Sequence, residues 1–207
     1  MGYSTDFTGQ WELSRPLTDD EANYLNKFAD TRRMKRDVKK LMEHHKGEHG
    51  LVGVPKTATA EEIYGIDGAF FVGGGGFAGQ DDEDTVIDFN TPPGVRPYND
   101  RHRLGYSINE DHKYVKESYQ PGLWCQWNVI DNKYIEWDGS EKFYNYIEWI
   151  EYIIKNFLNK WDVKLNGEVE WRGEDKEDIG KIVIQDNEIK VYEYEMTYTF
   201  KEVKKID

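Results

Sequence analysis

The chain has 207 residues, of which 32% are charged and 14% are aromatic, and its 40 acidic and 27 basic side chains give a net charge of −13. That length suits a single domain over residues 1–207 with its own core, and the aromatic content favours a folded globule over disorder. The negative charge opposes attraction to phosphate backbones and anionic membranes, so general nucleic-acid binding and membrane association are not expected.

Cysteine content and the absence of targeting signals predict a location. Cys125 is the only cysteine, which excludes an intramolecular disulfide and fits a reducing compartment. The sequence has no apolar run of membrane-spanning length, and its first residues lack the basic and apolar regions of a signal peptide. We therefore expect a cytoplasmic protein.

The first predicted elements are a strand and a helix. Residues 3–14 alternate loosely in polarity, which predicts a strand with a bulge or bend at Gly9. Thr18 and Glu21 have the spacing of a capping box, so a helix is predicted to begin there. The apolar stripe of this helix comprises Ala22, Leu25, Phe28 and Ala29.

Residues 31–40 form the only strongly basic segment of this acidic chain. A continuing helix would place Arg32, Arg36 and Lys40 on one face, with Arg33 beside it. Two interpretations stay open. The face is either solvated and paired with acids elsewhere, or it binds a phosphate or carboxylate through the planar fork of arginine.

Neither the histidines nor the acids that follow predict a metal site. His45 and His49 stand four residues apart, the spacing of helical metal ligands, but Gly47 lies between them and the helical context is missing. The acidic residues 81–84 lack the spaced ligands of an EF-hand, which favours a hydrated turn. We expect no metal.

A glycine-rich run at residues 73–79 follows a predicted short buried strand at 69–72. Three of its glycines match GxGxxG, but no helix comes after them, so no dinucleotide cofactor is expected. The glycines permit close approach of the backbone to a ligand or to another strand. Gly79 and Gln80 are therefore candidate ligand contacts.

Three stretches are expected outside the regular core. Residues 46–64 form a predicted loop with a helical turn near Ala60 to Tyr64, and residues 94–118 are polar and aperiodic. The last residues, 200–207, are charged and predict a frayed tail. Long loops of this kind are usually functional or mobile.

A tryptophan-rich hairpin follows, with predicted strands at 123–130 and 133–137 around an Asp-Asn turn. Trp124 and Gln126 share one face of the first strand, and the opposite face is apolar. A ligand is expected on the face with the tryptophan and the amide.

The principal core helix is predicted from Ser140 to about Trp161, because apolar residues recur there at helical spacing. Glu141, Lys142 and Tyr144 cluster at its start beside the hairpin. They form either a ligand wall or ordinary interleaved surface and core. Further strands are predicted at 163–171, 181–184 and 188–194. Together the elements predict an α+β fold, with a mostly antiparallel sheet packed against two main helices.

Six motifs spread over the chain are specific as a set: GYSTDF (2–7), FADTRRMKR (28–36), GFAGQ (76–80), QPGLWCQW (120–127), EWDGSEKFY (136–144) and NGEVEW (166–171). They resemble a family of uncharacterised proteins of bacteria and phages. The resemblance brings no established activity, and it marks 46–64 and 94–118 as insertions relative to shorter relatives. A phage or mobile-element setting implies an accessory protein that counters host functions in the host cytoplasm, an inference by analogy.

The favoured hypothesis is a pocket for a nucleotide-like anion, in which arginine binds phosphate and an aromatic ring stacks on the base. Such a pocket would be built by the basic segment, the glycine loop and the hairpin with the helix start. The candidate ligand-binding residues are Arg32, Arg33, Arg36, Gly79, Gln80, Trp124, Gln126, Trp137, Glu141, Lys142 and Tyr144.

Two alternatives remain. A hydrolase or group transferase acting on a nucleotide or phosphodiester could use Asp138, Glu141 or Glu148 as acids, with Gln126 and Arg36. The sequence shows no nucleophile–base pairing to support catalysis. An acidic inhibitor could instead bind a basic host protein through complementary charge.

Overall fold

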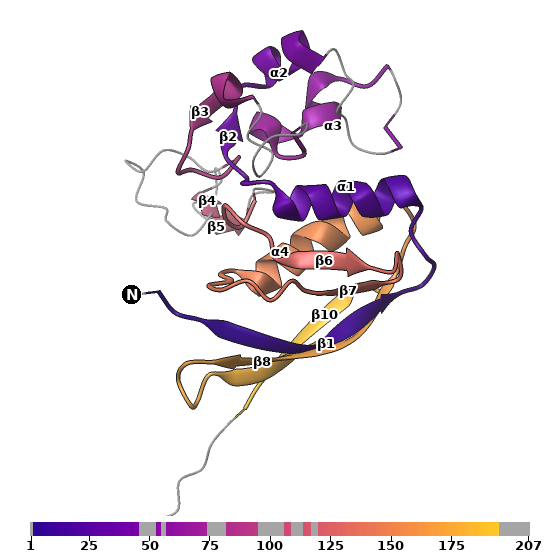
Figure 1. The fold of residues 1–207 in the computed structure, drawn as a ribbon, viewed down its shortest axis with the longest axis vertical. Helices are drawn as coiled ribbons and strands as arrows, with labels where there is room; N and C mark the ends of the chain where they lie inside the picture. Colours follow the sequence, from indigo (N-terminus) through magenta and orange to yellow (C-terminus); the bar gives the residue numbers. More distant parts are fainter. Residues whose placement is uncertain are drawn as a thin grey trace, which may run out of the picture.

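A six-stranded antiparallel sheet, with two helices laid on one of its faces, forms the largest part of the molecule (Figure 1). This arrangement confirms the predicted α+β class with two main helices against a mostly antiparallel sheet. The computed structural model describes residues 2–45, 53–54, 57–73, 82–94, 106–108, 114–116 and 120–194.

The sheet strands are β1 (Thr5–Leu13), β6 (Trp127–Ile130), β7 (Tyr134–Trp137), β8 (Leu165–Gly173), β9 (Ile179–Gln185) and β10 (Glu188–Glu193). Their order is β10-β9-β8-β1-β7-β6. The helices over the sheet are α1 (Asp19–Asp30) and α4 (Tyr146–Ile153), and α4 continues as the π-helical segment η4 (Ile154–Leu158). The strands predicted near the C-terminus are confirmed.

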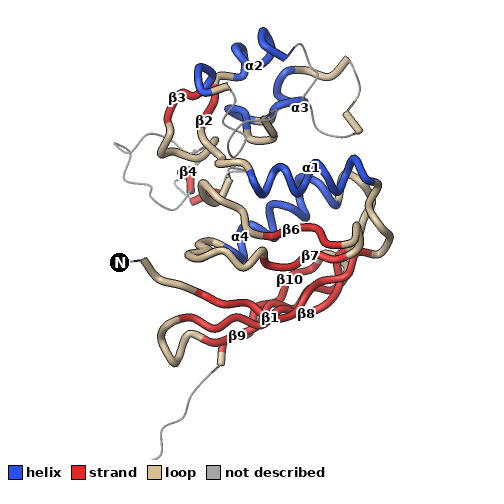
Figure 2. Tube along the Cα trace, in the orientation of Figure 1, coloured by secondary structure: helices blue, strands red, loops and turns tan. Residues whose placement is uncertain are grey.

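A second, smaller region lies on the far side of α1 and α4 from the sheet, as Figure 2 shows. We call residues 31–45, 57–73 and 82–94 the small lobe. Its elements are β2 (Lys35–Arg36), α2 (Val38–His45), α3 (Ala60–Tyr64), the 3-10 turns η1 (Ile66–Gly68) and η3 (Glu83–Thr85), and β3 (Val86–Asp88). β4 (Tyr106–Ile108) and β5 (Tyr114–Lys116) pair separately.

Alternation of side chains fixes which face of the sheet is buried. On β1, Phe7, Trp11 and Leu13 are buried between exposed neighbours, and β8 repeats the pattern with Leu165 and Val169. Because successive strand residues point to opposite faces, one face takes the helices and the other meets solvent.

The first strand is confirmed, and its pairing with β8 continues through Gly9 without a bulge. The pairing of β1 with β8 is continuous from Thr5 opposite Gly173 to Leu13 opposite Leu165. Gly9 has φ +105°, and a Cβ there would lie 2.7 Å from the carbonyl oxygen of Glu168. Only glycine suits that combination of torsion and close approach.

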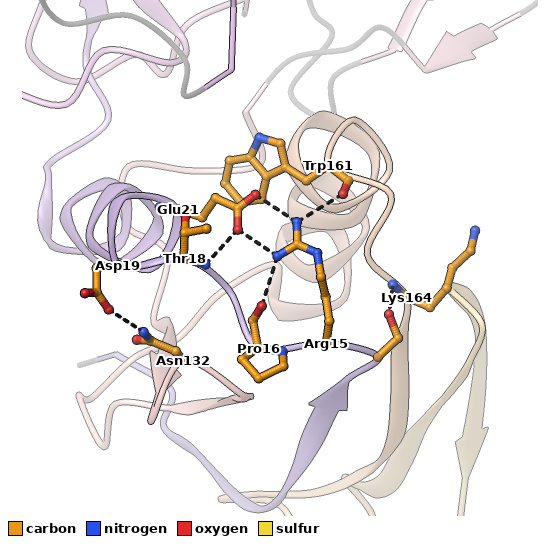
Figure 3. Close-up of polar contacts among 9 residues, drawn as sticks. Arg15, Pro16, Thr18, Asp19, Glu21, Asn132, Trp161 and Lys164 are labelled. Atoms are coloured by element: carbon orange, nitrogen blue, oxygen red, sulfur yellow. Dashed lines mark hydrogen bonds and ion pairs between the residues drawn. The ribbon is translucent and has the colours of Figure 1, made fainter.

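The turn between β1 and α1 is held by a polar cluster (Figure 3). Thr18 and Glu21 form the predicted capping box. Arg15 donates to both carboxylate oxygens of Glu21 at 2.9 Å, and also to the carbonyls of Pro16 and Trp161. One guanidinium therefore joins the end of β1, the start of α1 and the segment after η4.

The predicted hairpin is confirmed as β6 and β7, but its first strand begins at Trp127 rather than Leu123, so Trp124 and Gln126 precede the strand and do not share a strand face. Asp131 and Asn132 have φ of 51° and 55°, which are the positive values that a type I′ turn requires. The edge of β6 is partly closed by helix α1, because the side-chain amide of Asn26 donates to the carbonyl of Val129 and accepts from its N–H. A helix side chain thus replaces a neighbouring strand at this position.

The prediction that the first helix continues through residues 31–40 is wrong. α1 ends at Asp30, and Thr31 adopts extended torsions while its N–H and hydroxyl both donate to Lys27 O. The chain then forms β2 and a separate helix, α2. The single basic face of Arg32, Arg36 and Lys40 does not form, because a side-chain cap stops the helix before it reaches them.

Three other local predictions need correction. Residues 69–72 are buried but form no strand, and the stretch 94–118 includes the β4–β5 pair. Helix α4 begins at Tyr146 rather than near Ser140, since Lys142 and Asn145 have positive φ. The helical turn at Ala60 to Tyr64 is confirmed as α3.

Several sequence predictions lie outside the described residues. These include the glycine-rich loop with Gly79 and Gln80, the tail at 200–207, and His49, which was considered with His45 as a possible metal ligand. Within the described part of the chain, no helix combines the length and apolar character that crossing a membrane requires.

Candidate functional site

Arg33 is a structural side chain of the small lobe. It is 2% exposed, and its guanidinium donates to the carbonyls of Ala69 and Phe71 and, at 3.2 Å, to Gln120 Oε1. Its Cζ also lies 4.1 Å from the ring centre of Phe28. Burial lowers the pKa of Arg33 to about 10, so it stays charged near neutral pH.

Arg36 has a similar environment. It is buried, donates to the carbonyl of Asp82 and to Thr85 Oγ1 at 2.8 Å each, and its Cζ lies 4.8 Å from the ring centre of Phe71. Arg32 is only partly buried. The N–H of Arg33 donates to Leu123 O at 2.7 Å, which places the arginine segment beside the hairpin while two of its guanidinium groups turn into the small lobe.

The segments just before β6 and just after β7, together with the end of α1, enclose a cleft of about 350 Å³. It is lined by Ala29, Asp30, Trp124, Cys125, Gln126, Asp138, Ser140 and Glu141. The structure therefore brings together three of the predicted ligand residues, Trp124, Gln126 and Glu141. Trp124 is 43% exposed, an unusual position for a large aromatic side chain unless it packs against a partner.

Gln126 holds the walls of this cleft together. Its Nε2 donates to the carbonyl of Glu141, and its Oε1 accepts from Trp137 Nε1, both at 3.0 Å. Trp137 in turn packs with its ring centre 5.5 Å from that of Phe7. Gln126 and Trp137 thus fix the cleft on the sheet core and leave Trp124 and the acids at its surface.

Lys142 and Tyr144 are not among the residues that line the cleft, although Lys142 forms an ion pair with Glu141, which does line it. The hydroxyl of Tyr144 accepts from the N–H of Tyr3, and Lys142 Nζ is 3.8 Å from a carboxylate oxygen of Glu141. A Cβ on Gly2 would meet both side chains. These two residues therefore contact the start of the chain.

The lining of the cleft is acidic. Asp30, Asp138 and Glu141 supply three carboxylates, and none of the lining residues described here is an Arg or a Lys. The pKa of Asp30 is raised, first by partial burial and then by the charge of Asp138. Such a lining disfavours an anionic ligand and favours a cation, because like charges in one cleft destabilise each other.

Cys125 lines the same cleft but is not an activated nucleophile. It is buried, and burial raises the pKa of its thiol to about 12. The thiolate is the reactive form, so at neutral pH this side chain stays protonated.

Comparison with known proteins adds no identification. No protein-family model matches the chain. No curated protein and no solved structure matches it either. The resemblance to bacterial and phage proteins stays a prediction, and function has to be argued from the cleft.

The cleft includes one acid that the sequence analysis did not select. Asp30 is the last residue of α1, where the helix dipole disfavours negative charge. An acid at the C-terminal end of a helix is locally unfavourable, and this feature of the sequence could have marked Asp30 as a candidate binding residue. The feature could not be recognised, because the helix was predicted to continue past Asp30.

Proposed function

We propose that this is a binding protein whose acidic, aromatic cleft receives a cationic group, and that the cation is an arginine or lysine side chain of a basic partner protein. The observation that carries the proposal is the placement of exposed Trp124 among the carboxylates of Asp30, Asp138 and Glu141. An indole face attracts a guanidinium or ammonium group, and carboxylates accept its hydrogen bonds.

The size and net charge of the protein support a protein partner. A cleft of about 350 Å³ is large enough for one long side chain, and lies at the small end of the range for ligand pockets. The net charge of −13 steers a basic surface toward the protein and raises the association rate at low salt. The proposal corresponds to the acidic inhibitor considered from the sequence, and it assigns the cleft around Trp124 as the binding surface.

The nucleotide-like anion becomes the weaker candidate on the same geometry. Arginine contacts to phosphate were its basis, and Arg33 and Arg36 instead donate to backbone carbonyls and neighbouring side chains. A role in the host cytoplasm against host defence fits a charge-driven inhibitor, and it rests on the sequence resemblance.

The test is isothermal titration of the full chain with an arginine-rich peptide, a lysine-rich peptide, and a panel of nucleotides and cyclic dinucleotides. The basic peptides are expected to bind. Trp124→Ala is expected to weaken binding roughly tenfold, as loss of a cation–π contact of 1–2 kcal/mol implies. Asp138→Asn should weaken it as well, and added salt should lower the affinity.

Asp131→Asn is the matched control. It makes the same charge change on the same hairpin, in the turn, where Asn also tolerates the positive φ. If this control weakens binding as much as Asp138→Asn does, net charge and not the cleft determines the affinity. Binding of nucleotides without binding of the basic peptides contradicts the proposal and restores the anion hypothesis.

Hydrolysis is the second candidate, favoured by one observation. Asp30 has a raised pKa beside the carboxylate of Asp138, and a carboxyl group with a raised pKa can act as a general acid. Chromogenic glycosides and phosphodiesters provide the test. Turnover that disappears in Asp30→Asn, with no such loss in Asp131→Asn, would establish an enzyme in place of a binding protein.

A further inference from the structure

A second cluster of polar side chains lies in the small lobe, where the end of α2 meets η3. His44 and His45 are the last residues of α2, and Asp82 and Asp84 come from the turn opposite. His44 Nε2 lies 3.3 Å from Asp84 Oδ2, and His44 Nδ1 lies 3.8 Å from Asp82 Oδ1. None of these residues lines the cleft described above.

The cluster has the spacing of metal ligands. One ligand atom each from His44, Asp82 and Asp84 can be chosen so that all lie within 4.8 Å of one another. Bonds of ~2 Å to a tetrahedral ion place ligand atoms about 3.3 Å apart. The side chains of His44 and Asp84 are 40% and 63% exposed, so they can rotate to close the difference.

Asp82 is already held in place from behind. Its Oδ2 lies 2.7 Å from His45 Nε2, and its carbonyl accepts from the buried Arg36. Its side chain is 17% exposed, much less than that of His44. Neighbours that orient a ligating carboxylate in this way raise metal affinity, and they distinguish the cluster from a set of freely moving surface acids.

We propose that His44, Asp82 and Asp84 bind one divalent transition-metal ion, with Zn²⁺ as the best match, and that His45 positions Asp82. One imidazole and two carboxylates suit Zn²⁺ or Mn²⁺ better than Ca²⁺ or Mg²⁺, which prefer all-oxygen sites. Water completes the coordination. The ion joins the end of α2 to the turn at η3, two segments that His45 and Asp82 already connect over a sequence separation of 37.

The expectation of no metal was argued from the pair His45 and His49 and, separately, from the acids at 81–84, which include Asp82 and Asp84 but were not connected to His44. Residue spacing along the chain cannot bring His44 to Asp82 and Asp84, since a long connection separates them. The new set therefore depends on the fold alone.

The experiment titrates the full chain, after treatment with a chelator, with ZnCl₂ by calorimetry and with Co²⁺ by its visible absorption bands. One equivalent of Zn²⁺ is expected to bind and to raise the melting temperature, as any ligand of the folded state does. His44→Ala and Asp84→Asn should each weaken binding by roughly 100-fold, and His45→Ala by about tenfold.

Glu43→Gln is the control, because Glu43 is an exposed carboxylate on the same helix outside the cluster. It should leave Zn²⁺ affinity unchanged. Circular dichroism of each variant establishes that it is folded. Absence of Zn²⁺ binding overturns the proposal, and so does binding that persists unweakened in both His44→Ala and Asp84→Asn.

Discussion

The sheet with its two helices and the small lobe are stabilised by different interactions. The former has a continuous apolar core, in which Trp11, Trp127 and Phe143 form edge-to-face contacts with ring centres 4.8–5.0 Å apart. The small lobe has a cluster of only four buried apolar residues among those described, Leu41, Ile63, Tyr64 and Phe71. Ala69, Phe70 and Val72 attach the lobe to the main core, and two buried arginines supply hydrogen bonds inside it.

Backbone regularity explains the difference. In the sheet, neighbouring strands satisfy each other's N–H and C=O groups. The segment at 69–72 has no strand partner, yet it is buried, and buried carbonyls need hydrogen-bond donors. Arg33 supplies several donors from one side chain. A basic segment that looks like a ligand site in sequence can therefore serve an irregular backbone.

The largest effect is expected from opening the apolar core. Leu165→Ala on β8 truncates a fully buried side chain opposite Leu13 of β1, on the face of the sheet that the helices cover. It should lower the free energy of unfolding by about 4 kcal/mol, because the cavity adds to the lost burial. Urea denaturation followed by circular dichroism measures it. Val191→Ala on the exposed strand β10 is the control and should change stability by less than about 0.5 kcal/mol.

Replacing Arg33 tests whether hydrogen bonding supports the small lobe. Arg33→Met keeps much of the side-chain volume but removes the guanidinium donors to the carbonyl of Phe71 and to Gln120 Oε1, while the carbonyl of Ala69 still accepts from Gln120 Nε2. At 1–3 kcal/mol for each unsatisfied group, we expect a loss of about 3 kcal/mol. The effect should be local: amide exchange is expected to quicken in α2 and α3 and to stay slow in β1 and β8.

Arg172→Met provides the matched control, since Arg172 is exposed on β8. It is expected to change stability by less than about 0.5 kcal/mol. If Arg33→Met is equally neutral, water satisfies Phe71 O and Gln120 Oε1, and the buried arginine is not what supports the lobe. Quickened exchange throughout the sheet would show that the two regions unfold as one unit.

Regular elements of the main sheet could be predicted from sequence because local signals agreed with tertiary packing there. The capping box at Thr18, the Asp-Asn turn and the strand alternation each rest on a few neighbouring residues. Helix α1 was predicted too long because helical spacing continues past Asp30. The stop depends on Thr31 bonding back to Lys27, and on burial of arginines that only the fold reveals.

The cleft was predicted in part. Trp124, Gln126 and Glu141 come from one stretch of chain, so sequence proximity was enough to group them. Asp30 reaches them from the end of helix α1, and with Asp138 and Glu141 it makes the site acidic, whereas a basic site was expected. Arg33 and Arg36 could not be assigned from sequence, because the carbonyls they bind lie 36 to 46 residues away.

The smallest effect is expected at the Arg15–Glu21 pair, which lies at the turn between β1 and α1. This turn belongs to the sheet region, but like the small lobe it is held by a guanidinium group. Hydrogen bonds from Arg15 lower the pKa of Glu21 below its ordinary value of 4.5. A carboxyl whose pKa falls on folding stabilises the protein above its unfolded pKa, and this stabilisation is lost as pH falls through the folded pKa. Because Arg15 is 41% exposed, the pair should contribute about 1 kcal/mol or less.

Glu21→Gln keeps the capping box, since glutamine can also accept from the N–H of Thr18. Wild type should exceed this variant in stability by a constant amount above about pH 5.5, and the difference should shrink as pH falls below 4.5. Urea titrations at a series of pH values measure it. If the two proteins are equally stable at every pH, Arg15 holds the turn through the carbonyls of Pro16 and Trp161, as Arg33 holds the small lobe, and not through Glu21.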